Sequence, residues 1–124
     1  MVTAKVATHP KVLSASTLKG FAVKNHHGEE LGKVEELMID LENGRIGYCV
    51  ISFGGVLGIG SKLFAVPFKA MKINTTDQIC RLEVTKAKLT EAPGFDKDNW
   101  PDMTDKAWGG KIFGFYGEKP YWTD

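Results

Sequence analysis

The sequence has few of the residues that mark a secreted, membrane-spanning or metal-binding protein. Its 124 residues include only two cysteines, Cys49 and Cys80, which form no CxxC pair, so neither a disulfide framework nor a cysteine zinc site is expected. The longest run without charge, residues 46–61, is shorter than the roughly 20 residues of a membrane-spanning helix. The N-terminus lacks the apolar core of a secretory signal. We therefore expect a cytoplasmic protein with no membrane span and with two buried, reduced thiols.

The sequence also lacks a strong charge of either sign. The formal net charge is +1, which argues against strong nonspecific binding to nucleic acid or to an anionic membrane. The charge is unevenly distributed, because four lysines precede the first acid, Glu29, whereas acids outnumber lysines from Phe95 onward. Residues 1–16 are small, polar and without periodicity, and we expect a flexible N-terminal arm there.

The glycine-rich stretch at residues 54–62 is close in composition to a phosphate-binding loop but lacks the required context. In that motif a Gly-Lys-Ser/Thr sequence opens a helix, whose N-terminus faces the phosphates. Here the order is Gly60-Ser61-Lys62, and a strand-like run follows. We interpret the stretch as a connection between two strands. Its apolar residues are candidate contacts with a partner: Val56, Leu57 and Ile59.

No other motif predicts catalysis or metal binding. The acidic run at residues 96–102 has Trp100 and Pro101 where a calcium loop needs an oxygen ligand and glycine. His26 and His27 lie in a predicted turn, without metal-ligand spacing to another His or Cys. There is no GxSxG nucleophile motif. We expect no catalytic residue, no metal and no cofactor, and hence a protein that is not an enzyme.

Residues 17–92 alternate short β-type runs with turns, which predicts an all-β domain built as a small antiparallel barrel. Asn43-Gly44 between two apolar runs is a strong hairpin signal. In residues 32–41 the period-two pattern places Leu37 and Ile39 on one face. The predicted strands are residues 18–25, 32–41, 45–53, 63–68, 71–74 and 79–84, with Cys80, Leu82 and Val84 facing inward, and the one expected helix is residues 85–92.

Residues 93–124 form an aromatic C-terminal segment with little periodicity, and we expect an extended arm. It contains eight of the thirteen aromatic residues. The arm could seal its own barrel, or it could clasp a second copy, because exposed Trp and Tyr often mark interfaces. Stacking on single-stranded nucleic acid is disfavoured by the negative charge of the segment. The candidate contact residues are Trp100, Trp108, Phe113, Phe115, Tyr116, Tyr121 and Trp122.

These residues resemble the PRC-barrel domain. The resemblance rests on GEELGKVEELMID at residues 28–40, on the Gly-Arg-Ile-x-Tyr and Phe-Gly-Gly motifs within residues 44–55, and on KLFAVP at residues 62–67. It implies a small β-barrel that works by contact, as in the photosynthetic reaction-centre H subunit and in a ribosome maturation factor. It implies no catalytic residues, and this sequence lacks the membrane helix of the former and the N-terminal domain of the latter.

Two functions follow as hypotheses. The first is a non-enzymatic protein-interaction or adaptor module of this type, of prokaryotic origin, that forms a homodimer and binds an unidentified protein partner. The alternative is an RNA- or ribosome-associated module that uses the basic arm together with Lys33, Lys62, Lys69 and Lys72. Such binding would weaken steeply with salt, because phosphate contacts release counterions.

Overall fold

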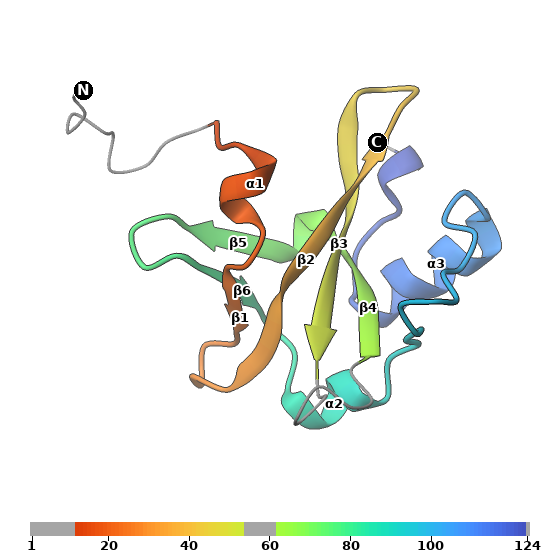
Figure 1. Ribbon diagram of the computed structural model, residues 1–124. Coiled ribbons are helices and arrows are strands. Elements are labelled where there is room, and N and C mark those ends of the chain that lie inside the picture. Colours follow the sequence, from red (N-terminus) through yellow and green to blue (C-terminus); the bar gives the residue numbers. More distant parts are fainter. Residues whose placement is uncertain (1–11, 54–61, 124) are drawn as a thin grey trace.

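The described part of the protein is a curled six-stranded sheet with three short α-helices (Figure 1). The structure is a computed structural model that describes residues 12–53 and 62–123. The strands are β1 (Ala22–Lys24), β2 (Glu30–Asp40), β3 (Arg45–Phe53), β4 (Lys62–Pro67), β5 (Met71–Asn74) and β6 (Ile79–Leu82). The helices are α1 (Ala15–Leu18), α2 (Lys86–Thr90) and α3 (Lys106–Phe115), with 3-10 turns η2 (Phe68–Ala70) and η3 (Tyr121–Thr123).

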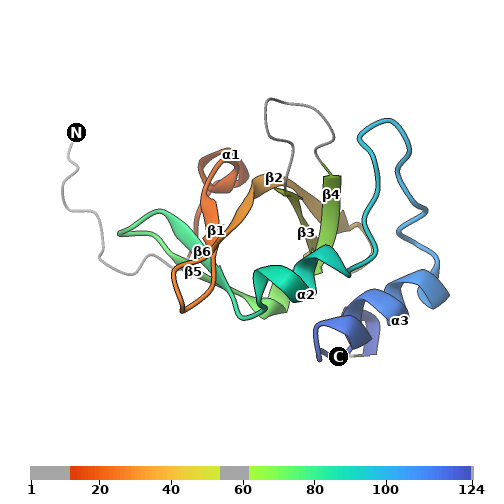
Figure 2. The same ribbon diagram turned by 90° about the horizontal axis from the view of Figure 1, so that it is seen from below.

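The strands form one sheet in the order β4-β3-β2-β1-β6-β5. The sheet curls around the core into a half-barrel (Figure 2), which confirms the predicted all-β, barrel-like fold. The predicted antiparallel pairing is wrong for one pair, since β1 and β6 run parallel. The chain passes through four other strands before β6 reaches β1, so no hairpin fixes their relative direction.

The two edges of the sheet differ. Beside β4, Leu63 and Phe95 form an antiparallel bridge, with N–H···O distances of 2.9 Å in both directions. Pro67, which has no N–H to donate, ends this edge strand. At the other edge, no strand in the described part of the chain pairs with the outer side of β5.

The β2–β3 hairpin is confirmed at the predicted turn, where Gly44 adopts a φ of +65°. The predicted alternation along β2 is wrong at its end. Leu37 packs against the core as expected, but Ile39 is 59% exposed. The register between β2 and β3 shifts between Met38 and Ile39, and an irregularity of this kind breaks the period-two alternation of faces.

Asp40 holds the hairpin turn together. Its carboxylate accepts hydrogen bonds from Asn43 Nδ2 at 3.1 Å, from Arg45 Nε at 3.3 Å and from the Glu42 backbone N–H at 3.1 Å. The Asn43 side chain, the Arg45 side chain and the backbone amides of the turn lower the pKa of Asp40 below its ordinary value of 3.8. The turn therefore favours the ionised carboxylate.

The lowered pKa predicts a pH-dependent contribution of Asp40 to stability. A carboxyl group whose pKa falls on folding stabilises the fold fully above its unfolded pKa, and this contribution is lost as pH falls through the folded value. The melting temperature of Asp40→Asn should therefore lie below that of wild type at neutral pH, and the difference should shrink as the pH falls below 3.8, the ordinary pKa of the group. Glu42→Gln in the same turn is the matched control. An Asp40→Asn difference that stayed constant with pH would contradict the assignment.

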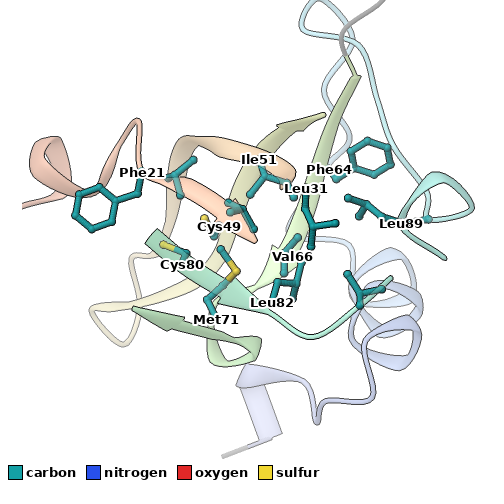
Figure 3. Packing of buried hydrophobic residues seen from close by; sticks show 14 of the residues in the cluster. Phe21, Leu31, Cys49, Ile51, Phe64, Val66, Met71, Cys80, Leu82 and Leu89 are labelled. Carbon is teal, nitrogen blue, oxygen red and sulfur yellow. The ribbon is translucent and has the colours of Figure 1, made fainter. Parts of the chain in front are cut away.

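The core lies inside the curl of the sheet and is apolar (Figure 3). Cys80, Leu82 and Val84 are buried, as predicted for this hairpin. Leu89 of α2 is fully buried in the same cluster, so the predicted short helix closes one end of the barrel. Other fully buried members are Val23, Leu31 and Val66.

The C-terminal segment is not the extended arm that the sequence predicts, because residues 106–115 form α3. Asp105 caps the helix by accepting hydrogen bonds from the N–H groups of Ala107 and Trp108. The helix lies outside the curled sheet, beside β4 (Figure 2). Its sequence, KAWGGKIFGF, contains three glycines, and each lowers helix propensity by about 1 kcal/mol relative to alanine. The signal for this helix is therefore weak in the sequence.

Candidate interaction surfaces

Most of the predicted aromatic contact residues pack on their own barrel in this structure. Tyr48 of β3 is 2% exposed, and its ring centroid lies 5.4 Å from that of Trp108 and 5.3 Å from that of Phe113. Phe113 is fully buried, and its ring also contacts those of Tyr121 and Trp122, each at 5.8 Å. The C-terminal segment thus forms a second hydrophobic cluster on the outer face of β3 and β4.

The remaining predicted contact residues are more dispersed. Trp100 is 40% exposed; its ring lies 5.0 Å from that of Phe95, and its indole N–H donates to the Lys97 carbonyl at 2.8 Å. The Lys88 ammonium lies 5.2 Å from the ring centroid of Phe115. Tyr116 packs against both hydrophobic clusters. Three further candidates, Val56, Leu57 and Ile59, lie outside the described residues.

Two tyrosine hydroxyls of the C-terminal interface are buried without a hydrogen-bond partner in the described part of the chain, those of Tyr48 and Tyr116. Burial raises the pKa of both phenols above their ordinary value. Both therefore stay protonated at neutral pH. Both hydroxyl oxygens are shielded from solvent, and the two rings pack in the hydrophobic clusters, so these side chains contribute packing.

An apolar groove of about 870 Å³ lies between α1 and β5, and we call it the α1–β5 groove. The groove is lined by residues of α1, β2, β3 and β5, and by residues that precede α1. Asn74 at the end of β5 and residues 75–77 of the following turn form a polar rim. The apolar lining includes Leu13, Leu18, Leu37, Ile46, Phe68 and Ile73.

Several side chains of the α1–β5 groove are open to solvent. Val12 is 89% exposed, and Leu13 and Ile73 are each 37% exposed. Grouped apolar exposure of this kind marks interaction sites more often than scattered exposed residues do. The sequence analysis missed this groove because its lining comes from segments that are far apart in the chain.

A second apolar surface lies at the tip of the β2–β3 hairpin, and we call it the hairpin-tip surface. Leu41 is 89% exposed and Ile39 is 59% exposed. They border a hollow of about 490 Å³ whose other apolar walls include Met38, Met103 and Trp122. The C-terminal segment therefore supplies one side of this surface, although most of its aromatic rings are buried.

The structure brings one of the predicted turn histidines, His26, to a carboxylate. His26 is exposed, and its Nδ1 lies within hydrogen-bond distance of Glu83 Oε1. This contact is the first cause of a lowered pKa of Glu83. Asn25, which is buried, anchors the same turn by donating to the Val84 carbonyl at 3.0 Å and to Glu29 at 2.7 Å. These contacts attach the turn at Asn25 and His26 to Glu83 and Val84, which follow the end of β6.

Neither the histidines nor the cysteines form a reactive centre in the described part of the chain. No group of three His, Cys, Asp or Glu side chains there is placed to hold a metal ion. Cys49 and Cys80 are buried and reduced, as the sequence predicts. Burial raises the pKa of Cys49 to about 12 and that of Cys80 to about 11, so neither is a thiolate nucleophile at neutral pH.

The four lysines of the RNA hypothesis do not lie together on one strand or one edge of the sheet. Lys33 is on β2, Lys62 on β4, Lys69 on η2 and Lys72 on β5. In the strand order, β4 and β5 are the opposite ends of the sheet. The four lysines of this hypothesis therefore come from four different elements.

The sequence model of the PRC-barrel domain matches residues 10–89, which covers the strands and helices from α1 to α2. No curated protein matches this sequence. Among the described residues, no helix combines the length and the apolar character needed to cross a bilayer.

Proposed function

Because the chain belongs to the PRC-barrel domain family, we propose that it is a non-enzymatic adaptor that self-associates through the hairpin-tip surface and binds another protein at the α1–β5 groove. The observation that carries this proposal is the presence of two separate exposed apolar surfaces on one small domain. An adaptor needs two contact surfaces that can be occupied at the same time.

The hairpin-tip surface has the features of a self-complementary contact. It combines a protruding side chain, Leu41, with an adjacent hollow bordered by Met38 and Trp122. In a two-fold dimer the same patch meets itself, so Leu41 of each copy can enter the hollow of the other. Self-association is assigned to this surface and not to the buried rings around Phe113 because contact with a second copy requires exposed side chains.

This assignment predicts that charges at the hairpin tip disrupt the dimer. Analytical ultracentrifugation should give a dimer for wild type and a monomer for the double variant Ile39→Lys and Leu41→Lys, because burying ammonium groups in an apolar contact is strongly unfavourable. Ile73→Ser in the α1–β5 groove is the control, and it should remain dimeric. A monomeric wild-type protein, or a dimer that tolerates both lysines, would contradict the assignment.

A further inference from the structure

The outer edge of β5 is available for strand pairing. β5 ends the sheet, and no strand within residues 12–53 and 62–123 pairs with it beyond β6. In an antiparallel pair, alternate residues direct their N–H and C=O groups away from the partner strand. Such an edge is a template for a further strand. The opposite edge differs, because Phe95 bridges Leu63 on β4.

The inner face of β5 leads into the α1–β5 groove. Ile73 is paired with the buried Cys80 of β6, so its side chain belongs to the inner face. It is nevertheless 37% exposed and lines the groove together with Leu13 and Leu37. A strand added beside β5 would direct every second side chain toward this apolar lining.

The outer face of β5 is the end of a row of cations. Lys24 of β1 is in register with Arg81 of β6, and Arg81 is in register with Lys72 of β5. Neighbouring strands lie about 4.8 Å apart, and like charges directly opposite one another on a sheet are unfavourable. Arg81 is partly compensated, because it donates to the Asn25 carbonyl at 2.9 Å and interacts with the Glu83 carboxylate. Lys72 is exposed, and no hydrogen bond or ion pair joins it to another residue in the described ranges.

We propose that β5 accepts an extended segment of a partner protein in which acidic and apolar residues alternate. The backbone of that segment pairs with the edge of β5. Its apolar side chains enter the α1–β5 groove beside Ile73, and its acidic side chains lie on the outer face beside Lys72 and extend the row of cations. The inference rests on the proposed adaptor function and specifies the chemistry of the second partner.

A protein segment fits this site better than single-stranded RNA does. Binding of single strands relies on aromatic rings that stack on bases, and the one aromatic ring in the groove lining, that of Phe68, is partly buried against the core. An RNA strand would also leave the edge groups of β5 without the regular ladder that a polypeptide provides.

The test uses the full-length protein and a capped peptide of about six residues, the usual length of a strand, in which valine and glutamate alternate. Titration followed by NMR should shift the amide signals of β5 and slow their hydrogen exchange, because new ladder bonds protect them. Binding should weaken as salt is added. A peptide with the same composition in two blocks should bind at least tenfold more weakly, because it cannot direct valines to the groove and glutamates to the outer face at the same time. A peptide with lysine in place of glutamate should also bind at least tenfold more weakly, because its ammonium groups would lie beside Lys72.

Matched protein variants separate the two faces. Lys72→Glu should weaken binding of the valine–glutamate peptide by more than tenfold and should favour the valine–lysine peptide. Ile73→Ser should weaken both peptides. Lys111→Glu, which changes an exposed charge on α3 by the same amount, should have no effect on either peptide.

Three results would overturn the inference: no binding of the alternating peptide, equal binding of the block peptide, or shifts that leave β5 unchanged. Tighter, salt-sensitive binding of oligouridylate at Lys72 would also overturn it and would favour a nucleic-acid role. If the peptide does not bind at β5, the hairpin-tip dimer is still tested independently by ultracentrifugation. The failure of the inferred partner and the failure of the self-association part of the proposed function can therefore be distinguished.

Discussion

Gly32→Ala should destabilise the protein by about 3–5 kcal/mol, the largest effect we expect from a single methyl group. Gly32 lies in β2 between β1 and β3, with a φ of +133°. L-amino acids rarely adopt this conformation. In addition, a Cβ at this position would overlap the carbonyl oxygen of Ser52 and would lie 2.9 Å from its carbonyl carbon. Both obstacles are backbone atoms within the sheet and cannot rotate away.

Urea denaturation followed by circular dichroism would measure the effect of Gly32→Ala. A domain of this size has a total stability of roughly 5–15 kcal/mol, so the variant should unfold at much lower urea or fail to fold. Gly110→Ala is the matched control, because a Cβ there meets nothing within 4 Å and Gly110 lies inside α3. We expect the control to be stabilised by about 0.5–1 kcal/mol. Equal urea midpoints for Gly32→Ala and wild type would contradict the close approach of β2 to β3.

Features that depend on neighbouring residues could be predicted from the sequence. The Asn43-Gly44 turn and the β-branched run that follows it identify the β2–β3 hairpin, because turn chemistry and strand propensity act locally. β3 has the predicted limits, Arg45–Phe53. The inward direction of Cys80 and Leu82 follows from period-two alternation in an undistorted hairpin. The family pattern lies mainly in these same segments.

Features that depend on tertiary contact could not be predicted in this way. The exposure of Ile39 follows from a register shift between β2 and β3. No residue type in the sequence indicates such a shift. The α1–β5 groove exists only where Leu13, Leu37 and Ile73 meet. The glycines of α3 lower its helix propensity, so the sequence pattern did not predict this helix. Gly109 is nevertheless required there, because a Cβ would lie 2.5 Å from the Tyr48 hydroxyl.

One signal of the covering helix was present in the sequence but was not used. Residues 47–51 of β3 and residues 63–67 of β4 are buried without interruption. A strand with one solvated face alternates, whereas a continuous apolar run indicates burial on both faces. The apolar run YCVI at residues 48–51 therefore required a cover on the outer face of the sheet. The aromatic C-terminal segment supplies that cover.

Phe113→Ala should cost about 3–5 kcal/mol of stability, because the C-terminal segment is part of the fold. Phe113 has no exposed surface, and it joins Tyr48 of β3 to the rings of Tyr121 and Trp122. Truncation to alanine leaves a cavity that the rigid sheet on one side and the neighbouring rings on the other cannot close. The near-ultraviolet circular dichroism signal of the tyrosine and tryptophan rings should also be weaker in Phe113→Ala than in wild type. Phe115→Ala, at a partly buried position at the end of α3, should have a smaller effect.

The concentration dependence of melting then separates packing within one chain from a clasp between two chains. If Phe113 packs on its own β3, the loss in melting temperature caused by Phe113→Ala is the same in dilute and concentrated protein. If the segment clasps a second copy, the loss depends on protein concentration, because association stabilises a fold by mass action. The measurement is best made in the hairpin-tip variant with Ile39→Lys and Leu41→Lys, in which the proposed dimer contact is removed. In that background, a loss in melting temperature that does not change with protein concentration would place the aromatic cluster within the monomer. A loss that changes with protein concentration would assign the cluster to the interface between copies.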